Sequence, residues 1–169
     1  ELSYQLYTEY LPFVNDSAIF YLEQCTDIAR KLNDPSKTGG CLSLMALCCS
    51  NAGIYLESVS ILKTIDPSQL NGIDLGLYYY AYSHVSNELA YYGKFANMRK
   101  LYAVASTRYF TLAQQHLPSN HKYNYMSQEM MLHKHNNIKQ SLSINNQWLQ
   151  QVQPGSTEYA IVAYYRYLD

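Results

Sequence analysis

Residues 38–65 read TGGCLSLMALCCSNAGIYLESVSILKTI and predict two helices that turn back on each other at Asn51-Ala52-Gly53. In the first half, apolar residues recur at the spacing of one helical stripe, at Leu42, Met45, Ala46 and Cys49. The second half repeats this period at Tyr55, Ser58, Val59 and Leu62. The stretch therefore predicts a helical hairpin in which each helix has one side to bury.

The turn of this hairpin recurs further along the chain. Gly53 is followed two residues later by Tyr55, and Gly93 is followed two residues later by Phe95. The two glycines are 40 residues apart, and a third turn at Asn136 follows 43 residues later. This period is typical of stacked helical hairpins, because one hairpin cannot bury both of its stripes alone. We expect the helices to cross closely at small residues, namely Ala18, Ser58 and Ser141.

Every other periodic segment also predicts a helix, and no segment shows the alternation between turns that marks a strand. We expect helices near Leu2–Leu11, Ala18–Leu32, Asp74–Tyr92, Phe95–Leu117, Lys122–Lys134, Ile138–Leu149 and Thr157–Leu168. Pro12 should interrupt or end the first of them, because proline lacks the N–H group that a helix interior needs. Residues 1–169 thus predict a single all-α domain of about four stacked antiparallel hairpins.

Two of the predicted buried stripes extend to a helix end. In the second helix the stripe continues to Ile28 and Leu32, and in the helix after Gly93 it begins at Phe95 and Met98.

The last predicted helix, Thr157–Leu168, is not followed by residues that typically end a helix. We therefore expect a partner helix beyond Asp169, so that the chain is part of a longer protein.

Composition narrows the classes of function. Hydrophobic residues make up 48% and charged residues 15%, which predicts a folded chain whose surface relies on Ser, Asn, Gln and Tyr. A net charge of −1 without a basic run argues against nucleic acid as a partner of this segment. Glycine, serine and asparagine interrupt the uncharged stretch 38–56, so it is no membrane span. A membrane would be reached only through a segment outside this chain.

No pattern of catalytic or metal-binding residues is visible. His133 and His135 are two positions apart and would point in different directions on a helix, so they cannot share a metal ion. The four cysteines lack metal-site spacing; we expect buried thiols, and a disulfide cannot be paired from the sequence. Phosphate-binding glycine loops and hydrolase motifs are also missing. These observations predict a protein that is not an enzyme and uses neither a metal nor a cofactor.

The hairpin pattern resembles the tetratricopeptide repeat, in which large, small, aromatic and glycine positions follow a fixed order. The residues that carry the resemblance are Leu42, Met45, Ala46, Cys49, Gly53, Tyr55, Ser58 and Leu62, then Val85, Ser86, Leu89, Gly93 and Phe95, and more weakly Asn136, Ile138, Ser141 and Pro154. Met98 stands where a small residue belongs, and the period exceeds the usual one. The resemblance implies a right-handed α-solenoid.

The beginning of the chain is similar to a narrower group of proteins. YLPFVNDSAIFYLEQCTDIARKLNDP, from Tyr10 to Pro35, is followed by a hairpin with NAGIYLESVSILKTID. Together they resemble the helical-repeat sensor regions of membrane-anchored Bacteroidetes regulators. The resemblance implies a periplasmic location, with a membrane helix and a cytoplasmic DNA-binding part outside this chain.

In tetratricopeptide-like stacks the first helix of each hairpin lines the concave side, so the resemblance also implies a groove. The predicted groove residues are Ser43, Leu47 and Ser50, then Tyr80, Ser83 and Asn87, then Tyr123, Met130 and His133. Hydroxyl groups, an amide and rings with little charge suit an extended peptide. The alternative is that Tyr80 and Tyr123 only pack on the neighbouring hairpin.

The sequence favours a non-enzymatic domain that binds a protein or peptide as the sensor or scaffold of a larger regulator. One alternative is a structural homo-oligomerisation module, in which aromatic residues of the last helix pair with another copy: Tyr159, Tyr164, Tyr165 and Tyr167. A weaker alternative is a hydrolase or small-molecule site beneath the helix that starts at Phe95.

Overall fold

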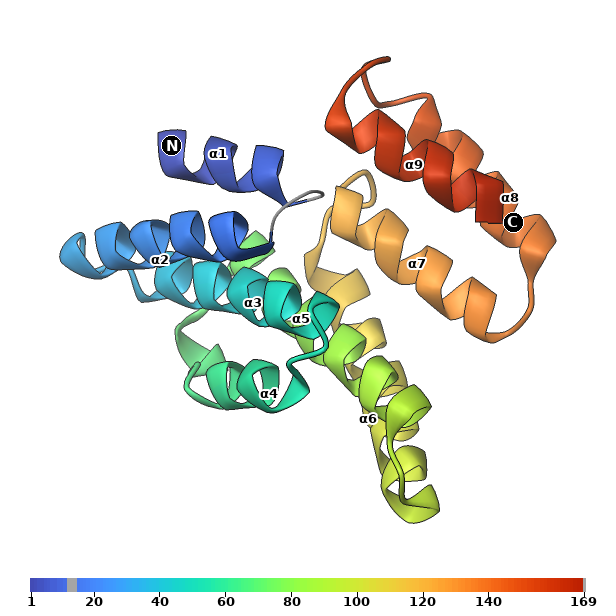
Figure 1. Cartoon of the computed structure of the whole chain (residues 1–169), viewed down its shortest axis with the longest axis horizontal. Helices are drawn as coiled ribbons and strands as arrows, with labels where there is room; N and C mark the ends of the chain where they lie inside the picture. Colours follow the sequence, from blue (N-terminus) through green and yellow to red (C-terminus); the bar gives the residue numbers. More distant parts are fainter. Residues whose placement is uncertain (12–14, 169) are drawn as a thin grey trace. The chain divides into compact units, whose positions relative to one another are not determined.

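The computed structural model describes residues 1–11 and 15–168, and within these ranges it contains helices and turns but no strand (Figure 1). The helices are α1 (Leu2–Tyr10), α2 (Asn15–Lys31), α3 (Pro35–Asn51), α4 (Tyr55–Lys63), α5 (Gly72–Tyr92), α6 (Ala96–His116), α7 (Lys122–Lys134), α8 (Ile138–Leu149) and α9 (Thr157–Leu168), with a 3-10 helix η1 (Pro67–Gln69) after α4. The all-α prediction is confirmed. Pro12, expected to end the first helix, lies outside the described residues.

The helices belong to two compact units. Unit 1 spans Glu1–Leu117 and unit 2 spans Pro118–Asp169. Unit 1 contains the hairpins α1/α2, α3/α4 and α5/α6, in which α2 packs on α3 and α3 packs on α5 (Figure 1). In unit 2, α7 and α8 form a further hairpin, and α9 packs on α8. That the two units form one domain stays a prediction.

Helix α3 begins at Pro35, before the glycine pair Gly39-Gly40. The side chain of Asp34 caps the helix by accepting a hydrogen bond from the backbone N–H of Lys37 (2.9 Å). Pro35 occupies the first turn, where a missing N–H group needs no partner. The helix then continues through Gly39 and Gly40 to Asn51.

The turns after the first helix of each hairpin are equivalent in position but not in conformation. Gly53 after α3 and Asn136 after α7 have positive φ angles of 77° and 54°, in the left-handed region that glycine and asparagine tolerate. Gly93 after α5 is extended, with φ −63° and ψ 136°. Glycine is required there for space, since a Cβ would lie 2.5 Å from the carbonyl oxygen of Leu89. The recurring glycine therefore meets two different physical needs.

Buried serines mark where the two helices of a hairpin cross. Ser58 of α4 is fully buried and donates a hydrogen bond to the carbonyl of Ala46 on α3 (2.9 Å). In the next hairpin, Ser83 of α5 donates to the carbonyl of Ser106 on α6 (2.9 Å), and both serines are fully buried. The close crossing at Ser58 is confirmed. The crossing of α5 and α6 lies far from the turn at Gly93. The position of Met98, close to that turn, therefore does not need the small residue that the repeat has there.

The stripe of α2 differs from the prediction in its last turns. Ala18 and Leu22 are fully buried as expected, but Ile28 is 48% exposed and Leu32 is 73% exposed. Thr26 takes the buried place instead, and its hydroxyl donates to the carbonyl of Leu22 (2.8 Å). A threonine whose hydroxyl bonds within its own helix can be buried at low cost.

The first turns of α6 also depart from the prediction. Phe95 is 74% exposed and Met98 is 43% exposed, although both were expected in the core. All residues from Lys94 to Leu101 are exposed. The buried residues of α6 lie further along, at Ser106 and Ala113, because this hairpin packs near that end.

Unit 2 has a small core around the one tryptophan of the chain. Trp148 is 1% exposed, lies parallel to the ring of Tyr125 (5.5 Å between centroids, 9° between planes) and packs with Val162 of α9. Its indole N–H donates to Oε1 of Glu158 (2.7 Å). Trp148 therefore links all three helices of unit 2.

The glycines inside α3 give neighbouring segments room. A Cβ on Gly40 would lie 2.5 Å from Oδ1 and 3.0 Å from Cγ of Asp74, and a Cβ on Gly39 would collide with the side chain of Leu70. Leu70 precedes α5, and Asp74 lies in the first turn of α5. Close packing, rather than a loop, accounts for the glycine pair.

We predict that Gly40→Ala destabilises the protein by about 1–3 kcal/mol, although alanine is the better helix former. The added methyl group would displace the buried carboxylate of Asp74. Denaturant unfolding followed by circular dichroism measures the change. In an Asp74→Ala background the same substitution should be neutral or stabilising, and an additive penalty there would contradict the explanation.

Candidate functional site

The nine predicted groove residues are mostly buried. The buried ones are Ser43, Leu47, Ser50, Tyr80, Ser83 and Tyr123; Asn87 and Met130 are half-buried, and His133 is exposed. The α3 and α5 sets lie in unit 1, whereas the α7 set lies in unit 2. Their role in binding stays a prediction. In this structure the buried side chains serve mainly to pack the helices.

Helix α3 is buried on nearly every side because α2, α4 and α5 all pack on it. Small side chains permit this; Ser43, for example, satisfies its hydroxyl on the carbonyl of Gly39 (2.8 Å). On the less buried side of α3 lies a row of three residues, in which Lys37 is exposed and Cys41 and Met45, at i+4 and i+8 from it, are half-buried; Thr38 and Leu42 beside them are half-buried as well. A ligand could reach α3 along this row.

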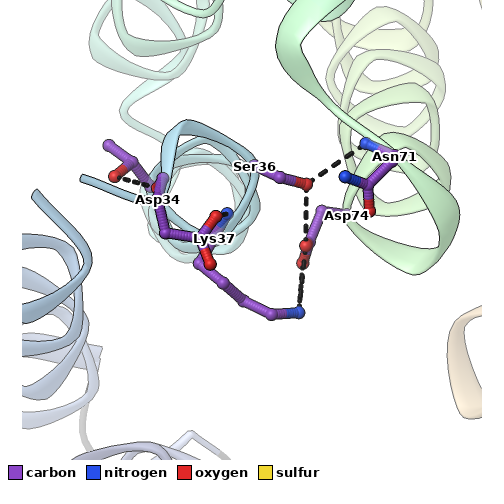
Figure 2. Close-up of polar contacts among 6 residues, drawn as sticks. Asp34, Ser36, Lys37, Asn71 and Asp74 are labelled. Carbon is purple, nitrogen blue, oxygen red and sulfur yellow. Dashed lines mark hydrogen bonds and ion pairs between the residues drawn. The ribbon is translucent and has the colours of Figure 1, made fainter. Parts of the chain in front are cut away.

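A network of polar contacts joins the start of α3 to the start of α5, as Figure 2 shows. The carboxylate of Asp74 is buried; it accepts from the hydroxyl of Ser36 (3.0 Å) and from Nζ of Lys37 (2.9 and 3.2 Å). The backbone N–H of Asn71 donates to the same Ser36 hydroxyl (3.1 Å). The side chain of Lys37 remains 63% exposed, so its ammonium group can also bind a ligand.

Helix α1 contributes a hydroxyl to the same neighbourhood. Burial raises the pKa of Tyr4, and electrostatic interactions with Cys41, Cys25 and Asp74 act in the same direction. Burial likewise raises the pKa of Cys41 to about 12, so this thiol stays protonated at neutral pH. A protonated thiol is a poor nucleophile. At neutral pH these groups offer hydrogen bonding and charge pairing.

The other end of the α3–α5 contact is also polar. Nε2 of His84 on α5 donates to Oδ1 of Asn51 on α3 (3.2 Å), and Asn87 follows one turn later. Because Lys37 meets Asp74 at one end and Asn51 meets His84 at the other, α3 and α5 run side by side in the same direction. Asn51 follows Lys37 by fourteen positions, which corresponds to about 21 Å along the helix axis.

The histidines act as local structural partners. Nε2 of His133 lies 2.9 Å from Oε1 of the buried Glu129, four residues earlier on the same helix, and His116 lies against the ring of Tyr79. The ring of His121 caps α7 by accepting from the backbone N–H of Tyr123 (3.4 Å). In the described ranges no three His, Cys, Asp or Glu side chains gather where they could hold a metal ion.

Each unit also has an open cavity. The one in unit 1 has a volume of 520 Å³ and lies where the α2–α3 turn meets the segment after α4. Polar groups line it beside an apolar floor: Arg30, Asn33, Asp34, Thr38, Asp66 and Gln69 around Leu42, Ile65 and Leu70. Its lining thus combines charged, polar and apolar groups.

The cavity in unit 2 has a volume of 550 Å³ and is lined in part by Trp148, Lys122, Gln151 and Glu158. Burial lowers the pKa of Lys122, although the negative charge of Glu158 opposes the shift. The carboxylate of Glu158 accepts a hydrogen bond from the indole N–H of Trp148. The polar groups here are tied to the core of unit 2, and we assign them no catalytic role.

Antiparallel hairpins, small residues at their crossings and an open row on a first helix define a tetratricopeptide-like repeat domain. Domains of this class mediate contacts between proteins. The chain belongs to the family described as the SusR N-terminal TPR domain, whose model matches residues 1–168. No curated protein and no solved structure matches the chain.

The family confirms the tetratricopeptide-like resemblance and agrees with the resemblance to Bacteroidetes regulators. Sequence reasoning missed Asp74 and Lys37, which lie 37 residues apart and share no local motif. Among the helices that the structure describes, none is long and apolar enough to cross a membrane.

His84 makes stability depend on pH. Burial lowers its pKa from 6.5 to about 4. Below pH 6.5 His84 therefore binds a proton in the unfolded chain but stays neutral in the folded chain. The free energy of unfolding consequently falls as the pH drops from 6.5 to 4. Denaturant unfolding should show this fall, about 1–3 kcal/mol, in the wild type relative to His84→Gln. Identical pH profiles would mean that His84 is solvated in the folded protein.

Proposed function

We propose that this chain is the protein- or peptide-binding part of a larger regulator, acting as a periplasmic sensor or scaffold. The family supports a module for contacts between proteins. The observation that carries the proposal is the accessible row on α3, which lies beside α5 and has the exposed ammonium group of Lys37 at one end.

The length and chemistry of this surface suit an extended peptide. The row from Lys37 to Met45 covers about 12 Å of helix, which matches about four residues of extended chain at about 3.4 Å each. Lys37 would pair with an acidic side chain or the terminal carboxylate of the peptide, while Asn87 would bond to its backbone. Cys41 and Met45 offer adaptable apolar contacts between these ends.

The proposed mechanism needs no bond-making step. A peptide that contacts α1, α3 and α5 together would stabilise one arrangement of the three hairpins, because the hairpins of a repeat domain contact only their neighbours. The bound state would then present the end of the repeat differently to the rest of the regulator. The raised pKa of Cys41 is consistent with a binding surface rather than a nucleophile.

A peptide-library selection followed by titration calorimetry tests the proposal. Lys37→Ala and Asn87→Ala should each weaken binding of a selected acidic peptide about fivefold to thirtyfold, the loss of one or two polar contacts. Lys63→Ala, which removes an exposed lysine at the end of α4, is the matched control and should bind normally. Unchanged affinity in both test variants would remove this surface as the site.

One observation favours homo-oligomerisation through α9 as a second candidate function. Tyr164 is 61% exposed and Tyr167 is 86% exposed, whereas Tyr165 packs near Trp148 (6.3 Å between rings). We predict that Tyr164→Ser with Tyr167→Ser lowers self-association measured by light scattering, without loss of helicity. A wild-type protein that stays monomeric at all concentrations would exclude this candidate.

A further inference from the structure

We propose that the chain self-associates through unit 1, with the outer face of α2 in one copy docked on the outer face of α6 in another. The acidic face of α2 consists of Asp16, Phe20, Glu23 and Asp27. The basic face of α6 consists of Lys100, Leu101, Val104 and Arg108. This contact uses neither the proposed peptide surface nor the tyrosines of α9, so charge reversal on its two faces tests it separately from both.

The acidic face is a single stripe on the side of α2 that points away from its core residues. Its members follow one another at spacings of four, three and four residues, so they lie in line on the helix. Asp16 and Glu23 are exposed, and Phe20 is 53% exposed at the centre. Asp27 has only a long contact to Arg30 (3.5 Å), with both side chains more than half exposed. Such surface pairs hold little energy.

The basic face has the opposite charge with the same layout. Lys100, Val104 and Arg108 are four residues apart, and Leu101 lies beside them. Leu101 is 64% exposed and Val104 is 70% exposed, on the side of α6 opposite the buried Ser106. Within the described part of the chain, neither Lys100 nor Arg108 forms an ion pair. From Leu89 to Gln128 the sequence has five basic residues and no acidic one.

Charge complementarity identifies the occupant of each face as another copy of this chain. Phe20 would cover Leu101 and Val104, and the carboxylates would flank the apolar centre opposite Lys100 and Arg108. Two α2 faces repel each other, as do two α6 faces, so the charges permit only the mixed pairing. Each copy carries both faces. The contact can therefore close reciprocally into a dimer or continue from copy to copy.

Charge reversal followed by mixing tests the interface. Sedimentation velocity on the full 169-residue chain at about 50 mM salt should show association that weakens at about 500 mM, as expected for exposed charges. Lys100→Glu with Arg108→Glu should raise the dissociation constant at least tenfold, and Glu23→Lys with Asp27→Lys should do the same. An equimolar mixture of the two double variants should regain association, which a merely misfolded variant could not do.

Two controls complete the experiment. Lys134→Glu with Lys139→Glu makes the same charge change on exposed lysines of unit 2 and should leave association intact. Circular dichroism must show wild-type helicity in every variant. Three results would overturn the proposal. The first is a wild type that stays monomeric, which would mean that unit 2 covers α6 or that α6 binds an anionic membrane instead. The second is a mixture of the two double variants that does not associate, and the third is association that is lost only when Tyr164 and Tyr167 are replaced.

Discussion

The structure of unit 1 depends on the burial of α3. Ten of its residues are buried, and they include two glycines and three serines beside larger apolar residues. Apart from Lys37 in its first turn, such a helix has little polar surface to turn towards water, so it is stable only when other helices surround it. The close approach of Asp74 and Leu70 at Gly40 and Gly39 completes this cover. The repeated hairpins are thus a consequence of one helix that needs neighbours on several sides.

Helical periodicity and turn residues were sufficient to predict the hairpins. The apolar period located the helices, and Asn51-Ala52-Gly53 located the reversal that the positive φ of Gly53 provides. Periodicity gives the direction of a side chain but not the number of helices around it. The resemblance to tetratricopeptide repeats placed Ser43 and Ser50 in a groove, and in the structure both side chains are buried. A serine can lie in a core once its hydroxyl bonds to a nearby carbonyl, as Ser43 does to Gly39.

The polar network at Asp74 could not be predicted from the sequence because its partners come from separate hairpins. Ser36 and Asp74 are 38 residues apart, and neither belongs to a recognisable motif. Only Gly40 hinted at this network, because a glycine inside a helix often marks a place where another group packs closely against the backbone. The exposed end of α6 was missed for the opposite reason. The apolar period at Phe95 and Met98 predicts burial, but the α5/α6 hairpin is longer than the α3/α4 hairpin beside it, so these residues are not covered.

The place of Trp148 gives this chain a built-in optical reporter. It is the one tryptophan in 169 residues, it lies in the core of unit 2, and unit 1 contains tyrosines but no tryptophan. Light absorbed selectively by indole therefore reports on the last three helices alone. Circular dichroism sums over the whole chain, so the difference between the two signals isolates the behaviour of the first three hairpins without any label.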